Sequence, residues 1–219
     1  MRSLRFFGIC ALSTLMLVAP SFAAEATDAP SPQIAPAEHQ IAASILAAPE
    51  DQRESATVLG YGADGELGTL RAGEGTMVCL ADKPGDDRFH VACYHRDLEP
   101  FMARGRALKA EGHDRDAVQA TRLAEIEAGT LSIPDAPTAL YNVSGPEGAF
   151  DAETGTLSDV RRVHVVYIPY ATEETTGISA APRTDGTPWL MGAGKPWAHI
   201  MIIPPPPAPA EAEAEASEE

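Results

Sequence analysis

Three histidines lie within apolar, strand-like stretches and are the first candidates for chemistry. His90 occurs in Phe-His-Val, His164 in Val-His-Val and His199 in Ala-His-Ile. Imidazole is a common metal ligand and a common general base. Three imidazoles converging from adjacent strands, with a carboxylate as fourth ligand, would bind a metal ion in a metal-dependent enzyme. Metal sites usually show close ligand spacing, which these residues lack, so three separately packed histidines are the alternative interpretation.

Two tryptophans near the end of the chain form a second candidate site. Trp189 and Trp197 flank the turn residues Gly192 and Gly194, which predicts a hairpin in which the two indoles face each other. Such a cross-strand aromatic pair contributes up to about 1 kcal/mol. Trp197 and His199 fall on one face of the final strand. We expect Trp189, Trp197 and His199 to be either a core contact or the aromatic wall of a small-ligand site.

Cys79 and Cys93 are placed symmetrically about a predicted turn at 84–87. Two β-rich runs flank this Pro-Gly-Asp-Asp segment, so pairing them puts the two cysteines opposite each other. We therefore predict one cross-strand disulfide, which is typical of proteins in oxidising compartments. The third cysteine, Cys10, lies in a predicted leader.

Familiar catalytic motifs occur only in fragments. Gly60-Tyr-Gly-Ala-Asp-Gly65 matches a dinucleotide-binding pattern, but it leads into a predicted strand where that site needs a helix. His95-Arg-Asp-Leu98 resembles part of a kinase catalytic loop, without the other kinase motifs. The leading hypothesis is thus a non-enzymatic binding or envelope-associated module, and a metal-dependent enzyme is the alternative. We expect no cofactor; a flavin in the sheet is a third hypothesis that rests on loose analogy with split barrels.

The ends of the chain indicate export. Residues 1–23 have the basic start, short apolar run and small-residue cleavage site of a signal peptide. Residues 24–37 read as a disordered linker, and 204–219 as a Pro-rich, acidic, disordered tail. The net charge of −16 argues against nucleic-acid binding, and no second apolar run predicts a membrane span. We expect a soluble periplasmic or secreted protein with a small-molecule or protein partner.

The elements that position these residues are expected in one domain, residues 38–203. Helices are predicted near 41–46, between Asp97 as cap and Gly112, and at 116–128. Strands are predicted at 56–61, 67–71, 76–82, 88–94, 139–143, 149–157, 163–168 and 188–203. Strands, an inserted helical pair and further strands favour an α+β fold with a mostly antiparallel sheet.

Three segments resemble a family of uncharacterised exported bacterial proteins with no assigned function. They are Ala47–Asp51 with the following Ser55–Val58, Leu70–Cys79 with Asp82 and Pro84, and Pro188–Met191 continued by Gly194–Met201. The resemblance implies export and a single domain. It transfers no activity, cofactor or catalytic residue to this chain.

Overall fold

A computed structural model describes residues 33–205 of the chain. The predicted signal peptide with Cys10, most of the predicted linker and all but the first two residues of the predicted tail lie outside the described residues. The helices are α1 (Ala37–Ile45), α2 (Glu99–Ala110), α3 (Arg115–Glu127) and α4 (Glu173–Thr176). The strands are β1 (Thr57–Tyr61), β2 (Leu67–Arg71), β3 (Met77–Leu80), β4 (Arg88–His95), β5 (Thr138–Pro146), β6 (Phe150–Asp151), β7 (Thr156–Leu157), β8 (Arg161–Tyr167), β9 (Trp189–Met191) and β10 (His199–Ile202).

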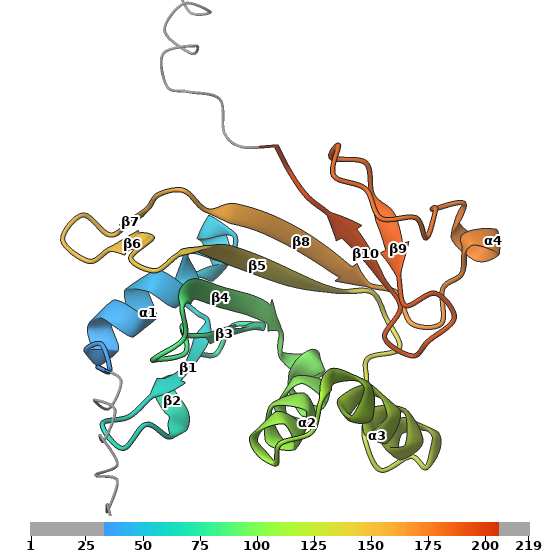
Figure 1. The fold of residues 1–219 in the computed structure, drawn as a ribbon, viewed down its shortest axis with the longest axis horizontal. Coiled ribbons are helices and arrows are strands. Elements are labelled where there is room, and N and C mark those ends of the chain that lie inside the picture. Colours follow the sequence, from blue (N-terminus) through green and yellow to red (C-terminus); the bar gives the residue numbers. More distant parts are fainter. Residues whose placement is uncertain (1–32, 206–219) are drawn as a thin grey trace, which may run out of the picture. The chain divides into compact units, whose positions relative to one another are not determined.

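Within residues 33–205 the main sheet has eight strands in the order β2-β1-β3-β4-β5-β8-β10-β9 (Figure 1). All neighbours pair antiparallel except β1 and β3, which are parallel. The predicted α+β fold with a mostly antiparallel sheet and an inserted helical pair is confirmed. The predicted strand at 149–157 is wrong in detail: it folds back on itself as a separate two-stranded hairpin of β6 and β7, where Gly155 donates to the carbonyl of Asp151 at 2.8 Å.

The connection from β2 to β3 crosses the start of β1 at very short range. A Cβ atom added to Gly73 would lie 2.3 Å from the carbonyl oxygen of Ser55, so only glycine fits this crossing. The hydroxyl of Thr57 donates to the Gly73 carbonyl at 3.1 Å and holds the crossing in place. This short path brings β3 beside β1 in the parallel direction.

The predicted disulfide is present. Cys79 in β3 lies directly opposite Cys93 in β4, with an S–S distance of 2.04 Å and a Cα–Cα distance of 4.0 Å. Both cysteines are fully buried on the face of the sheet that α1 covers. The alternation of side chains along β4 then directs His90, Ala92 and Tyr94 to the opposite face.

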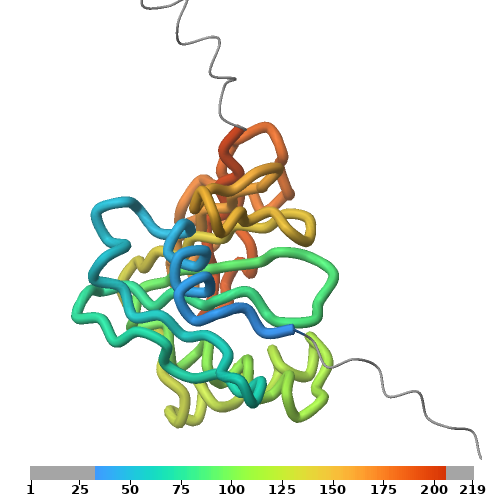
Figure 2. The backbone as a smooth tube through the Cα atoms, turned by 90° about the vertical axis from the view of Figure 1, so that its left-hand side faces the viewer, coloured from blue at the N-terminus to red at the C-terminus, as the bar shows by residue number. Residues whose placement is uncertain are grey.

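Each face of the sheet has its own apolar core. On one face Ala43 of α1 and the alanines just after the helix pack with Val58, Val91 and Val143 around the disulfide. In Figure 2 the blue α1 runs alongside the green β3–β4 segment. On the other face Tyr94, Leu140, Val165 and Tyr167 meet residues of α2 and α3, which lie together and apart from α1 in both views.

The helical pair begins differently from its prediction. Asp97 does not cap α2; it lies inside a short 3-10 turn, Arg96–Leu98, and α2 starts at Glu99 with Leu98 at its N-cap position. The reason is burial, because Leu98 is fully buried in the core and the extra turn takes it there. Asp114 caps α3 as an Asx cap should, accepting from the backbone N–H of Ala117 at 2.8 Å.

The predicted pairing of Trp189 with Trp197 is wrong. Met201 lies opposite Trp189, and His199 lies opposite Met191. The intervening segment is a longer connection, in which the N–H of Gly194 bonds to the carbonyl of Ala171 at 2.8 Å. Trp197 therefore precedes β10 and packs on Phe101 of α2, with ring centroids 6.0 Å apart. None of the helices within residues 33–205 is long and apolar enough to cross a membrane.

Candidate functional site

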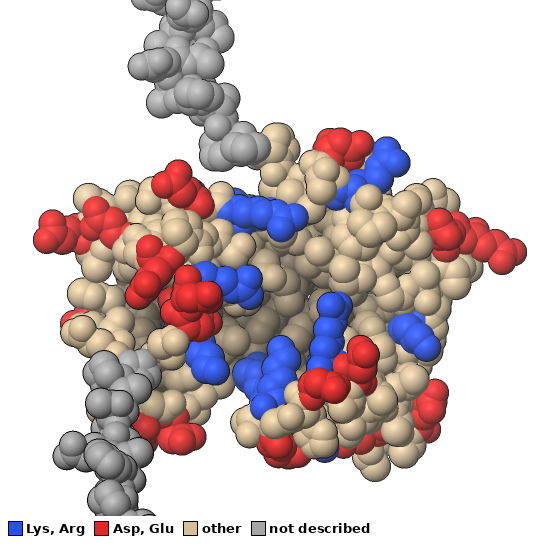
Figure 3. Space-filling view, viewed as in Figure 1, with Lys and Arg blue, Asp and Glu red and all other residues tan. Residues whose placement is uncertain are grey.

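A cavity of about 280 Å³ lies between the sheet and the helices α2 and α3, and we call it the helix–sheet cavity. Figure 3 shows this side of the molecule hollowed, with Lys and Arg side chains gathered around the hollow. The cavity is lined by Leu80, His90, Ala92, Tyr94, Phe101, Met102, Gly105, Arg106, Lys109, Gln119, Arg122, Leu140, Asn142, Tyr167, Trp197 and His199. Apolar walls with a few convergent polar groups are the usual composition of a small-molecule site.

The strands supply the floor of the cavity through their alternation. His90 of β4 lies opposite Ser144, and two positions along the same pair of strands Ala92 lies opposite Asn142. His199 of β10 lies opposite Tyr167 of β8, and the two rings are 5.0 Å apart. Two histidines that are 109 residues apart in the sequence thus reach one cavity from different parts of the sheet.

Both cavity histidines are held by backbone hydrogen bonds and are partly buried. The backbone N–H of His90 donates to the Asp82 carboxylate at 2.8 Å, which fixes this end of β4. Burial lowers the pKa of His90, and the hydrogen bond to the Asn142 side chain opposes this effect; the charges of Arg88, Asp86 and Lys109 act more weakly and in mixed directions. We therefore expect the His90 ring to be neutral at pH 7.

His199 has a defined tautomer. Its Nδ1 lies 2.7 Å from the carbonyl oxygen of Trp197, which can only accept, so Nδ1 carries the proton. Burial lowers the pKa of His199, although the same carbonyl opposes this effect. A neutral ring with Nδ1 protonated leaves Nε2 as a hydrogen-bond acceptor.

Tyr94 and Arg106 belong to one wall of the cavity, and hydrogen bonds join both to Glu99, which is not among the lining residues. The Tyr94 hydroxyl donates to Glu99 Oε2 at 2.5 Å, and Arg106 donates to the Tyr94 oxygen at 2.9 Å and to Glu99 Oε1 at 2.6 Å. Burial and the bond to Glu99 raise the pKa of Tyr94, so it stays a neutral phenol. Glu99 offsets the charge of Arg106.

Arg122 of α3 is the most deeply buried cation of the cavity, with 9% of the residue exposed. Its guanidinium lies over the Phe101 ring at 3.8 Å, and its Nη atoms donate to the Phe101 carbonyl and to Gln119 Oε1, each at 3.0 Å. Within residues 33–205 no carboxylate forms a salt bridge with it, and its Nε has no hydrogen-bond partner. Burial lowers its pKa, but an arginine keeps its proton at any physiological pH.

The structure divides the residues predicted to form a site. Trp197, His199 and His90 line the helix–sheet cavity. Trp189 does not: it is buried next to Met201 and away from the residues that line this cavity. The predicted ligand trio Trp189, Trp197 and His199 therefore loses one member.

The predicted metal trio of His90, His164 and His199 does not converge. His164 lies opposite Tyr141, which shares the face of Cys93, and its ring packs edge-on against Tyr141 at 5.5 Å. His90 and His199 lie on the other face of the sheet, so the three imidazoles cannot ligate one ion. In the described part of the chain no group of three or more His, Cys, Asp or Glu side chains is placed to hold a metal.

Sequence reasoning missed Arg122, the residue with the most unusual environment. A signal was present, because Arg122 stands four residues after Val118 and four before Ile126, on the apolar stripe of a predicted helix. A second signal is Gly105, which sits in the middle of α2 without ending the helix. A Cβ there would lie 2.8 Å from Arg122 Nη1, so the missing side chain leaves space for the guanidinium.

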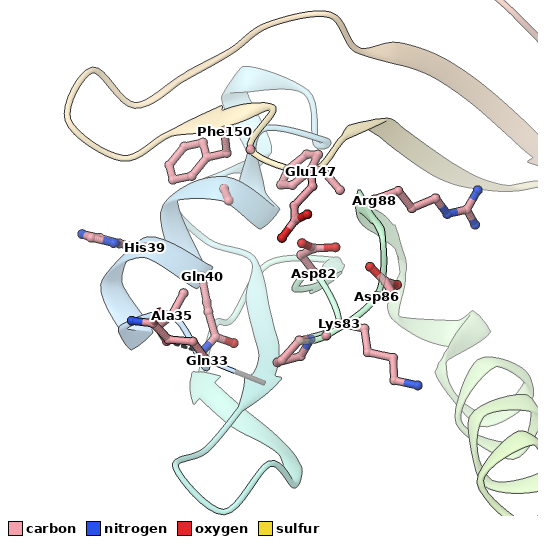
Figure 4. A pocket seen from close by; sticks show the side chains of 15 residues that line it. Gln33, Ala35, His39, Gln40, Asp82, Lys83, Asp86, Arg88, Glu147 and Phe150 are labelled. Carbon is pink, nitrogen blue, oxygen red and sulfur yellow. Dashed lines mark hydrogen bonds between the residues drawn. The ribbon is translucent and has the colours of Figure 1, made fainter. Parts of the chain in front are cut away.

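A second cavity, of about 250 Å³, lies on the α1 face and is acidic. Figure 4 shows the carboxylates of Asp82 and Glu147 pointing toward one another, while Lys83 and Arg88 extend away. Burial raises the pKa of Asp82, and the charges of Asp86 and Glu147 add to this. Asp82 is occupied with the backbone N–H of His90, and Gln40 is bonded to the backbone of Ala35 and Tyr61, which gives both a structural role.

Comparisons of the chain with protein-family models, with curated proteins and with solved structures find no match.

Proposed function

We propose that this chain is an exported binding module, periplasmic or secreted, that holds a small organic ligand in the helix–sheet cavity. One observation carries the proposal: His90 lines the same cavity as Trp197 and His199, which lie more than 100 residues later in the sequence. Residues that only fill a core need not gather around an opening. The predicted signal peptide and the buried disulfide support an oxidising location outside the cytoplasm.

The shape and lining of the cavity favour a ligand with one aromatic or apolar part. Its volume of about 280 Å³ is near the lower end for small-molecule sites. Phe101 and Trp197 lie stacked with an interplanar angle of 28° and provide a flat apolar wall. A planar ring placed on this wall would bury one of its faces against the protein.

A binding module is favoured over a metal-dependent enzyme because of where His164 lies. The enzyme hypothesis requires the three histidines to meet at one point, and His164 is on the opposite face of the sheet from His90 and His199. The remaining pair of imidazoles is compatible with binding a polar group of a ligand.

The test is an NMR titration of ¹⁵N-labelled protein purified from an oxidising compartment. Indole, benzyl alcohol and benzoate serve as probes, and at least one is expected to shift the amide resonances of residues lining the cavity. Trp197→Ala should weaken that binding at least fivefold. Trp189→Phe, which changes the other tryptophan outside the cavity, should leave it unchanged.

Two results would contradict the proposal. One is that none of the three probes shifts a resonance of the cavity. The other is that Trp197→Ala lowers the stability of the fold but leaves binding of the probe intact, since Trp197 would then act only in the core.

A further inference from the structure

We infer that the ligand of the helix–sheet cavity carries an anionic group, a carboxylate or a phosphate, and that Arg122 binds this group. The inference rests on the proposed binding function and specifies its ligand. It follows from the charges around the cavity, the environment of Arg122 and the space left at Gly105.

The charge of the cavity is opposite to that of the chain. The sequence has 32 acidic and 16 basic residues. In the described structure, however, the cavity is lined by Arg106, Lys109 and Arg122 and by no Asp or Glu. Arg88 and Asp86, outside this lining, act on the pKa of His90 with opposite signs, so the lining cations set the charge of the cavity. An acidic protein that concentrates cations at one hollow attracts anions there and repels them elsewhere.

Arg122 is set apart from the arginines of the neighbouring helix. Arg104 has Glu125 at 2.7 Å and Arg106 has Glu99 at 2.6 Å, and both arginines are about one-quarter to one-third exposed. Arg122 is more deeply buried, yet among residues 33–205 it has no carboxylate partner. Of the three arginines, Arg122 therefore has the largest desolvation cost, and it is the one without a counter-charge among the described residues.

A buried charge without a partner is costly, and proteins normally pair such a group. Two of the five N–H groups of Arg122 bond to neutral oxygens of Phe101 and Gln119, and its Nε has no partner. The planar guanidinium fork suits the two oxygens of a carboxylate or phosphate. An anionic ligand would supply the missing counter-charge.

Gly105 of α2 leaves room for the guanidinium of Arg122 at the cavity wall. Glycine inside a helix is destabilising relative to alanine. At this position a Cβ would come within 2.8 Å of Nη1 and 3.2 Å of Cζ of Arg122. Gly105 and Arg122 both line the cavity, so the absence of a side chain at Gly105 lets the guanidinium pack against the helix backbone at the cavity wall.

The experiment compares four probes that share one ring and differ in charge. Benzoate, phenyl phosphate, benzyl alcohol and benzylamine are titrated at pH 7 and low salt, and amide shifts of the cavity residues give each Kd. We expect at least one anion to bind about tenfold more tightly than benzyl alcohol, and benzylamine to bind most weakly. The tighter of the two anions identifies a carboxylate or a phosphate as the preferred group.

Variants then assign the preference to Arg122. Arg122→Gln should remove the preference for anions while keeping binding of benzyl alcohol. Should Arg122→Gln fail to fold by circular dichroism, Lys109→Gln tests the positive charge of the cavity at an exposed residue of α2. This variant should weaken binding of benzoate about threefold without affecting binding of benzyl alcohol. Arg104→Gln is the matched control for Lys109→Gln, because Arg104 is also on α2 but is not among the residues that line the cavity.

The outcomes separate this inference from the proposed function. Equal affinity for benzoate, phenyl phosphate and benzyl alcohol would overturn the anionic ligand but keep the binding site. An anion preference that survives both Arg122→Gln and Lys109→Gln would overturn the role of these cations. Absence of binding for all four probes would overturn the proposed function together with the inference.

Discussion

The guanidinium carbon of Arg122 lies 3.8 Å from the centre of the Phe101 ring, although the two residues belong to different helices. The same ring stacks on Trp197, which precedes β10. The cation, the phenyl ring and the indole thus connect α3, α2 and the C-terminal part of the sheet. A cation over an aromatic face contributes from about 0.5 to 2 kcal/mol, depending on desolvation. The aromatic wall and the buried charge of the cavity are therefore in direct contact through the Phe101 ring.

Removal of the disulfide should destabilise the fold markedly. The bridge joins residues 14 positions apart in the sequence, and a closed loop of this size corresponds to about 3 kcal/mol in the chain-entropy estimate. Cys79→Ala with Cys93→Ala should lower the free energy of unfolding by about 2–4 kcal/mol, measured by urea denaturation. A loss below about 1 kcal/mol would mean that α1 and the surrounding core hold β3 and β4 without the bridge.

The disulfide hairpin was predictable because its determinants are local. The turn at 84–87 and the alternation of the two flanking strands set the register that places Cys79 opposite Cys93. The tryptophan hairpin has similar local signals, but its connection is fixed by the distant carbonyl of Ala171. A bond from another part of the chain leaves no trace in the spacing of Trp189 and Trp197, so the predicted register was wrong.

The candidate site was predictable only where its residues have a local signal in the sequence. His90 and His199 stood out as polar residues inside apolar strands, and the structure brings both to one cavity. The same criterion, a polar residue on an apolar face, would have singled out Arg122 in the predicted helix at 116–128. Its contact with Phe101, 21 residues earlier, depends on how α2 packs against α3, and no local pattern specifies that packing.

Gly105→Ala should destabilise the protein although alanine is the better helix former. Propensity alone predicts a gain of up to about 1 kcal/mol. The added Cβ would lie 2.8 Å from Nη1 of Arg122, whose guanidinium is fixed by bonds to Phe101 and Gln119 and has little freedom to retreat. Thermal unfolding should therefore show a lower Tm for the variant.

A double-mutant cycle provides the control for Gly105. In an Arg122→Met background the flexible thioether side chain can move aside, and Gly105→Ala should become neutral or stabilising. The same loss of Tm in both backgrounds would show that the clash with Arg122 is not the cause.

Tyr94→Phe should cost about 1–2 kcal/mol of unfolding free energy. The hydroxyl of Tyr94 is bonded to both Glu99 and Arg106 and sits in a residue that is 2% exposed. Its removal leaves the direct pair of Arg106 and Glu99 in place but deprives both charged groups of one partner. Tyr141→Phe is the matched control, because Tyr141 is half-buried on the opposite face and its hydroxyl makes no hydrogen bond within residues 33–205. A similar cost for both substitutions would argue against the network.

Binding of benzoate should strengthen as the pH falls from 7.5 to 5. Burial lowers the pKa of His90 and of His199 from the ordinary value of 6.5, so both rings are neutral at pH 7.5, and their protonation becomes more favourable as the pH decreases. Benzoate stays largely ionised because a carboxyl group titrates near pH 4. Each proton gained by His90 or His199 adds positive charge beside the cavity and favours binding of the anion, and by linkage the bound anion favours protonation.

Affinity measured by NMR at several pH values should rise for benzoate as the pH decreases and stay constant for benzyl alcohol. The double variant His90→Asn with His199→Asn should lose the pH dependence, whereas His164→Asn, on the other face of the sheet, should keep it. A pH dependence that persists in the double variant would assign the titration to groups other than these two imidazoles.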